Sequence, residues 1–244
     1  AVTLALLAAG PAAFAECVNP AAAGEETSAE RLSARMKDCM NASDLDAALL
    51  WARQLAGQGS VSGQTSLGLI YLARNEVSEA IAWFEKAAEK KDPVAINNLA
   101  AIYVTGTGGE VNFVKAVRYY REAVELGDAH AMTRLGMLYE KGQGVDKDLA
   151  QARKLFEAAA DKGDAGGQFQ LALMHHYGKG ASKDPGLARH FYEMSAQQGY
   201  VASQINLAVL LMQGQGGSQD YLHAAQWVAK AADQGHPDAL VLQG

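Results

Sequence analysis

One position of this chain recurs every 36 residues, and it is a glycine in four of its five occurrences. The five residues are Lys91, Gly127, Gly163, Gly199 and Gly235. In each full interval a leucine follows eight residues later, at Leu99, Leu135, Leu171 and Leu207. A period of this length with a constant apolar pattern is typical of repeat proteins, in which each unit buries its apolar face only against its neighbours. The sequence therefore predicts an all-α fold, an α/α superhelical solenoid of helix-turn-helix repeats.

A pair of glycines separated by one residue lies between the two helices expected in each repeat. The pairs are Gly106 and Gly108, Gly142 and Gly144, Gly178 and Gly180, and Gly214 and Gly216. Glycine adopts positive φ without steric cost, so this pair is expected to end the first helix and turn the chain. A phosphate-binding loop is the less favoured interpretation, because no strand pattern precedes the pair and no Lys-Ser/Thr follows it.

The second helix expected in each repeat carries an alanine and, three residues later, a large apolar residue. The alanines are Ala116, Ala152, Ala188 and Ala224, and the large residues are Tyr119, Leu155, Phe191 and Trp227. We expect the repeating leucine and the large residue to fill the seam between the helices. The alanine lets the two helix axes approach to about 8–10 Å.

These intervals divide the chain into repeats and flanking segments. Full repeats are expected at residues 91–126, 127–162, 163–198 and 199–234, a shorter one at 59–90 and a partial terminal repeat at 235–244. Residues 16–58 match the pattern poorly at their start, and we interpret them as an N-terminal extension with a capping helix pair.

The first 15 residues have a different character. They are rich in alanine and leucine and carry no charge, and Ala13-Phe14-Ala15 fits the small-x-small rule for signal peptidase. We interpret residues 1–15 as a partial signal peptide cleaved after Ala15, which implies a periplasmic or secreted bacterial protein. A buried first helix is the alternative interpretation. The run is too short to cross a bilayer, so no stable membrane insertion is expected.

The chain has two cysteines, Cys17 and Cys39, both near its N-terminal end. In an exported protein an even number of cysteines favours a disulfide, here one that ties the leading segment to the first helix pair. The chain-entropy model gives such a bond at most about 3 kcal/mol. Two unpaired thiols are the alternative.

A family resemblance is strongest between Met132 and Ala160. This segment contains Leu135-Gly136-Met137-Leu138-Tyr139, then Gly142-Gln143-Gly144-Val145, Asp148 and Ala152. It resembles the consensus of the Sel-1-like repeat family, a branch of the tetratricopeptide superfamily, and the resemblance extends over residues 59–240. It implies a scaffold that binds a protein or a peptide. Exported relatives regulate membrane sensor kinases, assist flagellar motors, or act in envelope assembly and host contact.

The resemblance also implies a binding surface, because in this superfamily the first helix of each repeat lines the concave side. A polar ladder able to bond a peptide backbone is expected there, formed by Asn98, Arg134, Gln170 and Asn206. Apolar residues flank it, among them Met137, Phe169 and Leu173. Each apolar residue could instead pack on the adjoining second helix, and this alternative stays open.

Some exported members of the family hydrolyse β-lactams, so a cell-wall or β-lactam hydrolase is the alternative function. No serine is followed three residues later by lysine, and Gly-x-Ser-x-Gly does not occur. His175 and His176 are adjacent and point about 100° apart on a helix, which is poor geometry for one metal ion. The sequence therefore predicts no catalytic residue, no metal site and no cofactor, and the protein is not expected to be an enzyme.

The overall charge bears on the class of partner. The formal net charge is −6 and the pI is about 5.5. Nucleic acids and anionic membranes are not attracted to an acidic protein, so neither is expected to bind. The expected partner is a protein or a peptide, and the chain itself is expected to be a monomer.

Overall fold

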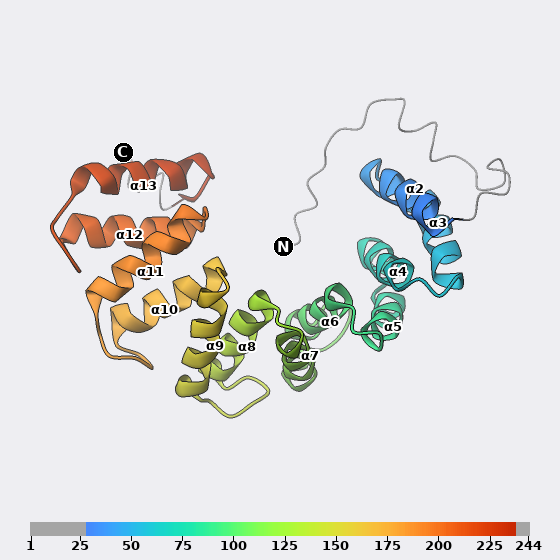
Figure 1. The fold of residues 1–244 in the computed structure, drawn as a ribbon, viewed down its shortest axis with the longest axis horizontal. Helices are drawn as coiled ribbons and strands as arrows, with labels where there is room; N and C mark the ends of the chain where they lie inside the picture. The colour runs from blue at the N-terminus through green and yellow to red at the C-terminus, as the bar shows by residue number, and fades with distance from the viewer. Residues whose placement is uncertain (1–27, 238–244) are drawn as a thin grey trace. The chain divides into compact units, whose positions relative to one another are not determined.

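The computed structural model describes residues 28–237, and over this range it contains twelve α-helices and no strand. The helices form antiparallel pairs that follow one another in chain order (Figure 1). This confirms an all-α solenoid of stacked helical hairpins. The helices are α2 (Ala29–Asn41), α3 (Leu45–Gly57), α4 (Val61–Ala73), α5 (Val77–Ala88), α6 (Pro93–Thr105), α7 (Phe113–Glu125), α8 (Ala129–Lys141), α9 (Leu149–Asp161), α10 (Ala165–Tyr177), α11 (Pro185–Gln197), α12 (Val201–Gln213) and α13 (Tyr221–Asp233).

The chain forms two compact units that meet in sequence between Asn112 and Phe113. In the first unit α2 packs on α3, α3 on α4, α4 on α5, and α5 on α6. In the second unit each helix from α7 to α13 packs in the same way on the next. The division falls in the loop between α6 and α7, inside the interval 91–126 that the sequence pattern treats as one repeat. We describe the two units separately.

The glycines that recur every 36 residues follow the second helix of each pair, where the backbone turns into the left-handed region. The φ values are 85° at Gly127 and 84° at both Gly163 and Gly199. Lys91, the one exception to glycine, has a φ of 58°. Residues with a Cβ resist this conformation, so the backbone explains why glycine returns at this position.

The Gly-x-Gly pairs also have the expected turn conformation. The first glycine of each pair is the left-handed C-cap of its helix, with φ of 68° at Gly142 and 70° at Gly178. The second glycine has an additional role that the sequence does not predict. A Cβ at Gly144 would overlap the backbone carbonyl of Phe113, the first residue of α7. The loop of one repeat therefore packs directly against the second helix of the repeat before it.

The core follows the predicted pattern in part. The repeating leucines and alanines are buried, as expected for the seam between helices. The large residue three places after the alanine does not always fill the seam, because Phe191 and Trp227 are only partly buried. In three of the four repeats the residue one place further along is the more deeply buried one, and Phe156 and Tyr192 have no exposed surface. The exception is the pair Tyr119 and Tyr120, which are buried alike. Gly136 on α8 makes room for Phe156, since a Cβ there would lie 2.5 Å from its ring.

Replacing Gly144 by alanine should destabilise the protein more than replacing Gly163 by alanine. Both glycines have positive φ, which costs a residue with a Cβ about 1–2 kcal/mol. A Cβ at Gly163 meets no other atom within 4 Å, whereas a Cβ at Gly144 collides with the α7 backbone. Chemical denaturation should therefore show a further loss for Gly144→Ala of about 1–3 kcal/mol. Equal losses would mean that the loop does not pack on α7.

Ala152 on α9 has no exposed surface, so Ala152→Leu should force the helices apart. We expect a loss of about 1–3 kcal/mol in the free energy of unfolding. Lys147 lies in the exposed loop before α9, and Lys147→Ala should change stability by no more than about 0.5 kcal/mol. Thermal melting of the two variants would contradict the repeat register if the melting temperatures were equal.

Candidate functional site

The predicted polar ladder lies on the first helices of successive repeats. Asn98 is on α6 in the first unit, while Arg134, Gln170 and Asn206 are on α8, α10 and α12 in the second unit. Arg134 is exposed and the three amide side chains are partly exposed. All four positions are therefore reachable from solvent, and within the second unit three consecutive first helices each supply one.

Two ladder residues have polar contacts along their own helix. The Nδ2 of Asn98 donates a hydrogen bond to the carbonyl oxygen of Val94 at 2.8 Å. The Nε of Arg134 donates to the Nε2 of His130 at 3.1 Å. The Nδ1 of His130 in turn lies 3.8 Å from a carboxylate oxygen of Asp164. Arg134 is thus anchored through its Nε, and its two terminal amino groups take no part in this contact.

Asp164 is the N-cap of α10 and a point where neighbouring repeats join. Burial alone would raise the pKa of its carboxyl group. The nearby His130 ring, with hydrogen bonds from the Thr133 hydroxyl at 2.6 Å and from the Gly167 backbone at 2.7 Å, lowers this pKa overall. The carboxylate therefore stays charged and ties α8 to the start of α10.

The apolar residues that flank the ladder make contacts inside the protein. Met137 packs on the buried cluster around Phe156, and Leu173 packs on the cluster around Tyr192. The ring of Phe169 lies 5.9 Å from that of Tyr192 and 5.0 Å from that of Tyr200. All three flanking residues keep some exposed surface. Packing on adjoining helices, the interpretation left open from the sequence, thus accounts for much of their burial.

Phe169 occupies a position that is polar in the three repeats before it and apolar, as Ile205, in the repeat after it. The equivalent Thr133 donates to the N-cap Asp164 of the next repeat, and in the first unit Thr65 donates to the N-cap Asp92 at 3.0 Å. Where phenylalanine replaces threonine, the N-cap of the next repeat is Tyr200 in place of aspartate. The two changes are matched, and they exchange a hydrogen bond for a contact between rings. Sequence reasoning missed this pairing because it compared equivalent positions of the repeats, and not different positions that meet where two neighbouring repeats pack.

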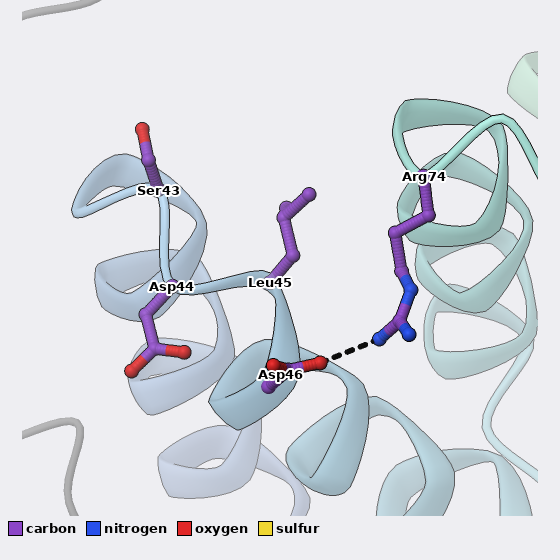
Figure 2. A pocket seen from close by; sticks show the side chains of 5 residues that line it. All are labelled: Ser43, Asp44, Leu45, Asp46 and Arg74. Carbon is purple, nitrogen blue, oxygen red and sulfur yellow. Dashed lines mark hydrogen bonds and ion pairs between the residues drawn. The ribbon is translucent and has the colours of Figure 1, made fainter.

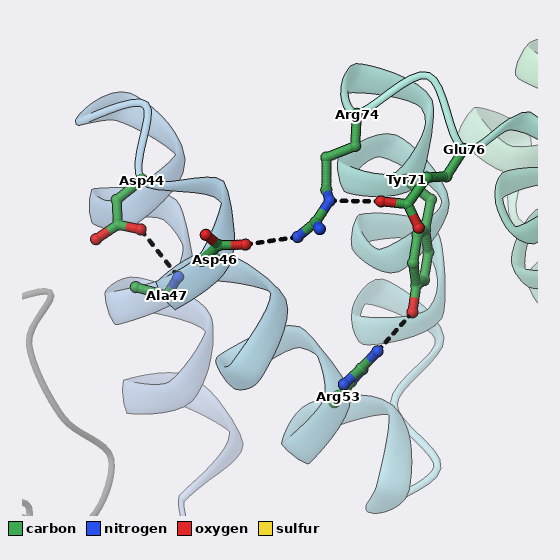
Figure 3. Close-up of polar contacts among 7 residues, drawn as sticks. All are labelled: Asp44, Asp46, Ala47, Arg53, Tyr71, Arg74 and Glu76. Carbon is green, nitrogen blue, oxygen red and sulfur yellow. Dashed lines mark hydrogen bonds and ion pairs between the residues drawn. The ribbon is translucent and has the colours of Figure 1, made fainter.

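The first unit contains a small open depression lined by Ser43, Asp44, Leu45, Asp46 and Arg74 (Figure 2). Arg74 lies at the turn between α4 and α5, and the other four residues come from the start of α3 and the turn before it. The Nη1 of Arg74 is 2.6 Å from Asp46, and its Nε is 2.6 Å from Glu76 (Figure 3). The hydrogen bond and charge of Glu76, with those of Asp46, raise the pKa of Arg74.

This depression is a structural contact and not a strong candidate for a binding site. The guanidinium of Arg74 already has two carboxylate partners. Asp44 accepts a hydrogen bond from the backbone of Ala47 as the N-cap of α3 (Figure 3). These contacts hold the α4–α5 turn against the start of α3.

A tyrosine that recurs in the repeat pattern also has a structural role. The Nη2 of Arg53 on α3 donates to the hydroxyl of Tyr71 on α4 at 2.8 Å (Figure 3). In the second unit Arg121 on α7 makes the same contact with Tyr139 on α8, also at 2.8 Å. Both pairs join the second helix of one repeat to the first helix of the next. The arginine stands 18 residues before the tyrosine in each case, a spacing that the sequence could have revealed.

The histidines on α10 are engaged in local contacts. The Nδ1 of His175 lies 3.1 Å from the carbonyl oxygen of Ser182, and that of His176 lies 3.3 Å from the hydroxyl of Tyr192. Burial, with the charge of Lys183, lowers the pKa of His176, and burial raises the pKa of Tyr192. Over residues 28–237 no three His, Cys, Asp or Glu side chains gather in a way that could hold a metal ion.

Several sequence predictions lie wholly or partly outside the described residues. The expected signal peptide at 1–15, Cys17 and residues 238–244 of the partial terminal repeat belong to this group. Cys39 is buried on α2, and its pairing with Cys17 stays a prediction. Between residues 28 and 237 no helix combines the length and the apolar character that a membrane span requires.

Comparison with known proteins identifies the family of the repeats and their bounds. The Sel1 repeat family model matches residues 61–92, 93–128, 129–164, 165–200 and 201–236. Each match begins at the first residue of a first helix, from α4 to α12. A search of curated proteins finds no match.

Solved structures with the same fold include three bacterial proteins. A protective antigen of uropathogenic Escherichia coli strains, which has an SLR fold, is 28% identical with a TM-score of 0.79 over 89% of this chain and 48% of its own. A Sel1 repeat protein from Oxalobacter formigenes is 27% identical with a TM-score of 0.75 over 87% of this chain and 86% of its own. A putative sel1 repeat protein from Klebsiella pneumoniae is 20% identical with a TM-score of 0.53, over 79% of this chain and 95% of its own, and shows the fold alone.

The lengths of these proteins differ, and this chain spans about half the length of the E. coli antigen. Sel1 repeats form scaffolds that mediate interactions between proteins and are generally not catalytic. Because the family model matches five consecutive segments that make up most of the sequence, the chain belongs to the Sel1 repeat family.

Proposed function

We propose that this protein is a non-catalytic scaffold that binds a protein or peptide segment on the face formed by the first helices α8, α10 and α12. One observation carries the proposal. Gln170 and Asn206 recur 36 residues apart, are partly exposed, and make no hydrogen bond to another residue in the range 28–237. Their amides remain available to a ligand, whereas Gln168 and Gln204 nearby are buried and already hydrogen-bonded.

The chemistry of these side chains suits a peptide backbone. A carboxamide offers an acceptor oxygen and a donor nitrogen, which match the N–H and C=O groups of a peptide unit. Arg134 adds a guanidinium whose Nε is anchored by His130, so its terminal amino groups can receive a carboxylate of the ligand. The binding face therefore combines backbone recognition on α10 and α12 with one charged contact on α8.

Phe169 is less suited to direct recognition than the sequence suggests. Its ring packs on Tyr192 and Tyr200, so Phe169→Ala should open a cavity between α10 and the start of α12. A loss of binding in that variant would mix a loss of stability with a loss of contact. The amide ladder gives a cleaner test.

Changing both Gln170 and Asn206 to alanine should weaken capture of the native partner from cell extract by about tenfold or more. Two lost hydrogen bonds of about 0.5–1.5 kcal/mol each correspond to a change of this size. The matched control is Gln197→Ala with Gln226→Ala, which removes two exposed amides from the second helices α11 and α13 of the same repeats.

Capture is measured by quantitative mass spectrometry on immobilised protein, and both double variants should keep wild-type helix content and melting temperature. If the control pair reduces capture while Gln170→Ala with Asn206→Ala does not, then the binding surface is on the second helices and the proposal is wrong.

We also propose that the protein is exported to the bacterial periplasm or secreted and acts as a regulatory or envelope-assembly adaptor. The uncharged segment 1–15 with Ala13-Phe14-Ala15 supports export, and exported relatives of this family support the adaptor role.

Expression and export in the native host should yield a mature protein that begins at Glu16 and contains one disulfide between Cys17 and Cys39. Signal peptidase cleaves after small residues, and an oxidising compartment favours the bond. Intact mass analysis of periplasmic material, with and without reduction before alkylation, measures both features. Two thiols that react with the alkylating reagent before reduction would contradict the disulfide.

A further inference from the structure

From α4 onward, charged residues are concentrated in the second helices and in one first helix, α8. The first helices α4, α6, α10 and α12 contain no Asp, Glu, Lys or Arg, whereas α8 carries Arg134, Glu140 and Lys141. Every second helix from α5 to α13 contains at least two. In the second unit the charged residues of these helices include Arg153 and Glu157 on α9, Arg189 and Glu193 on α11, and Lys230 and Asp233 on α13.

Burial does not fully explain the missing charges on α10 and α12. Both helices keep partly exposed side chains where a lysine or glutamate could reach water. On the proposed binding face these partly exposed side chains are Gln170, Leu173, Ile205, Asn206, Val209 and Met212. The surface that α10 and α12 offer is therefore made of amides and apolar groups.

This composition is typical of a surface that becomes buried when a partner binds. Charged residues are depleted in the core of protein interfaces, because a charge that loses its water without gaining a partner costs free energy. A second helix whose outer side stays in solvent can carry charged residues without this cost. On α9, for example, Arg153 and Glu157 form an ion pair at 3.5 Å. The contrast marks α10 and α12 as the covered part of the face.

We infer that the segment bound on α10 and α12 is an extended peptide with uncharged side chains, held through its backbone by Gln170 and Asn206. The inference rests on the binding face proposed above and specifies its ligand. An acidic or basic side chain of the ligand would be desolvated against α10 and α12 without an opposite charge. An extended backbone is required because a helical ligand has already used most of its N–H and C=O groups in its own hydrogen bonds.

A charged group of the ligand is accommodated only next to α8. Arg134 and His130 lie there, and the carboxylate of Asp164 on the far side of His130 is already engaged by Thr133 and Gly167. A carboxylate of the ligand fits beside Arg134. A lysine or arginine does not, because the α8 carboxylate of Glu140 is already paired with Lys179 at 3.1 Å. The ligand is therefore uncharged along α10 and α12 and tolerates an acidic residue only towards α8.

The test is a selection of short random peptides displayed on phage against the immobilised full chain. Clones that bind this face are identified by loss of binding to the variant with Gln170→Ala and Asn206→Ala, and by retained binding to the Gln197→Ala and Gln226→Ala control. Among those clones we expect Lys and Arg to be well below their frequency in the library, and Asp and Glu to be depleted except at the end that reaches α8. The affinity of synthetic peptides without an acidic residue at that end should change by no more than about twofold between about 50 mM and 500 mM NaCl.

Methylation of backbone nitrogens in the same peptides should weaken binding at the units that contact the ladder, because it removes the N–H donor. Three results would overturn the inference while leaving the binding face in place. Face-specific clones could be enriched in basic residues or in acidic residues away from α8, peptides without an acidic residue could lose affinity steeply with salt, or methylation could be tolerated at every position. If no clone is sensitive to the Gln170→Ala and Asn206→Ala pair, the proposed binding face itself fails.

Discussion

The stacking of the repeats depends on the contact between the second glycine of each Gly-x-Gly turn and the helix of the repeat before it. In the second unit Gly144 lies against Phe113, and Gly216 lies against Pro185, in both cases backbone on backbone. At these two steps no side chain intervenes, so the main chain sets how closely the turn approaches the helix. At Gly180, the third such glycine of the unit, the nearest atoms belong to the side chains of Met174 and Leu149.

Where the turn packs on the helix through its glycine, the side chains elsewhere between neighbouring repeats can vary. The pair Thr133 and Asp164 shows this variation, because it forms a hydrogen bond between repeats. One repeat later the equivalent residues, Phe169 and Tyr200, form a contact between rings. The same freedom extends to the exposed positions of the first helices. One backbone design can thus present amides on α10 and α12 and a guanidinium on α8 without changing how the repeats pack.

The sequence predicts the parts of the fold that arise from the backbone, because positive φ and close approach both favour glycine, with Lys91 as the exception at the recurring position. It does not decide whether Leu155 or Phe156 lies deeper, since adjacent residues point about 100° apart and the pattern does not fix the rotation of the helix so finely. The ladder positions were predictable because a 36-residue period returns them to the same place on each first helix. The packing of Phe169 was not, because its partner Tyr200 belongs to the next repeat.

The single arginine of the ladder has a physical consequence for the proposed binding mode. Amides spaced by identical repeats bind any peptide unit equally well, so Gln170 and Asn206 alone would let an extended ligand shift along the face. Arg134 is anchored through His130 at one end of this uncharged surface, and a carboxylate on the ligand gains its charged contact in one register only. In this arrangement the amides provide affinity for a backbone, and the position of one charge selects which part of the ligand they hold.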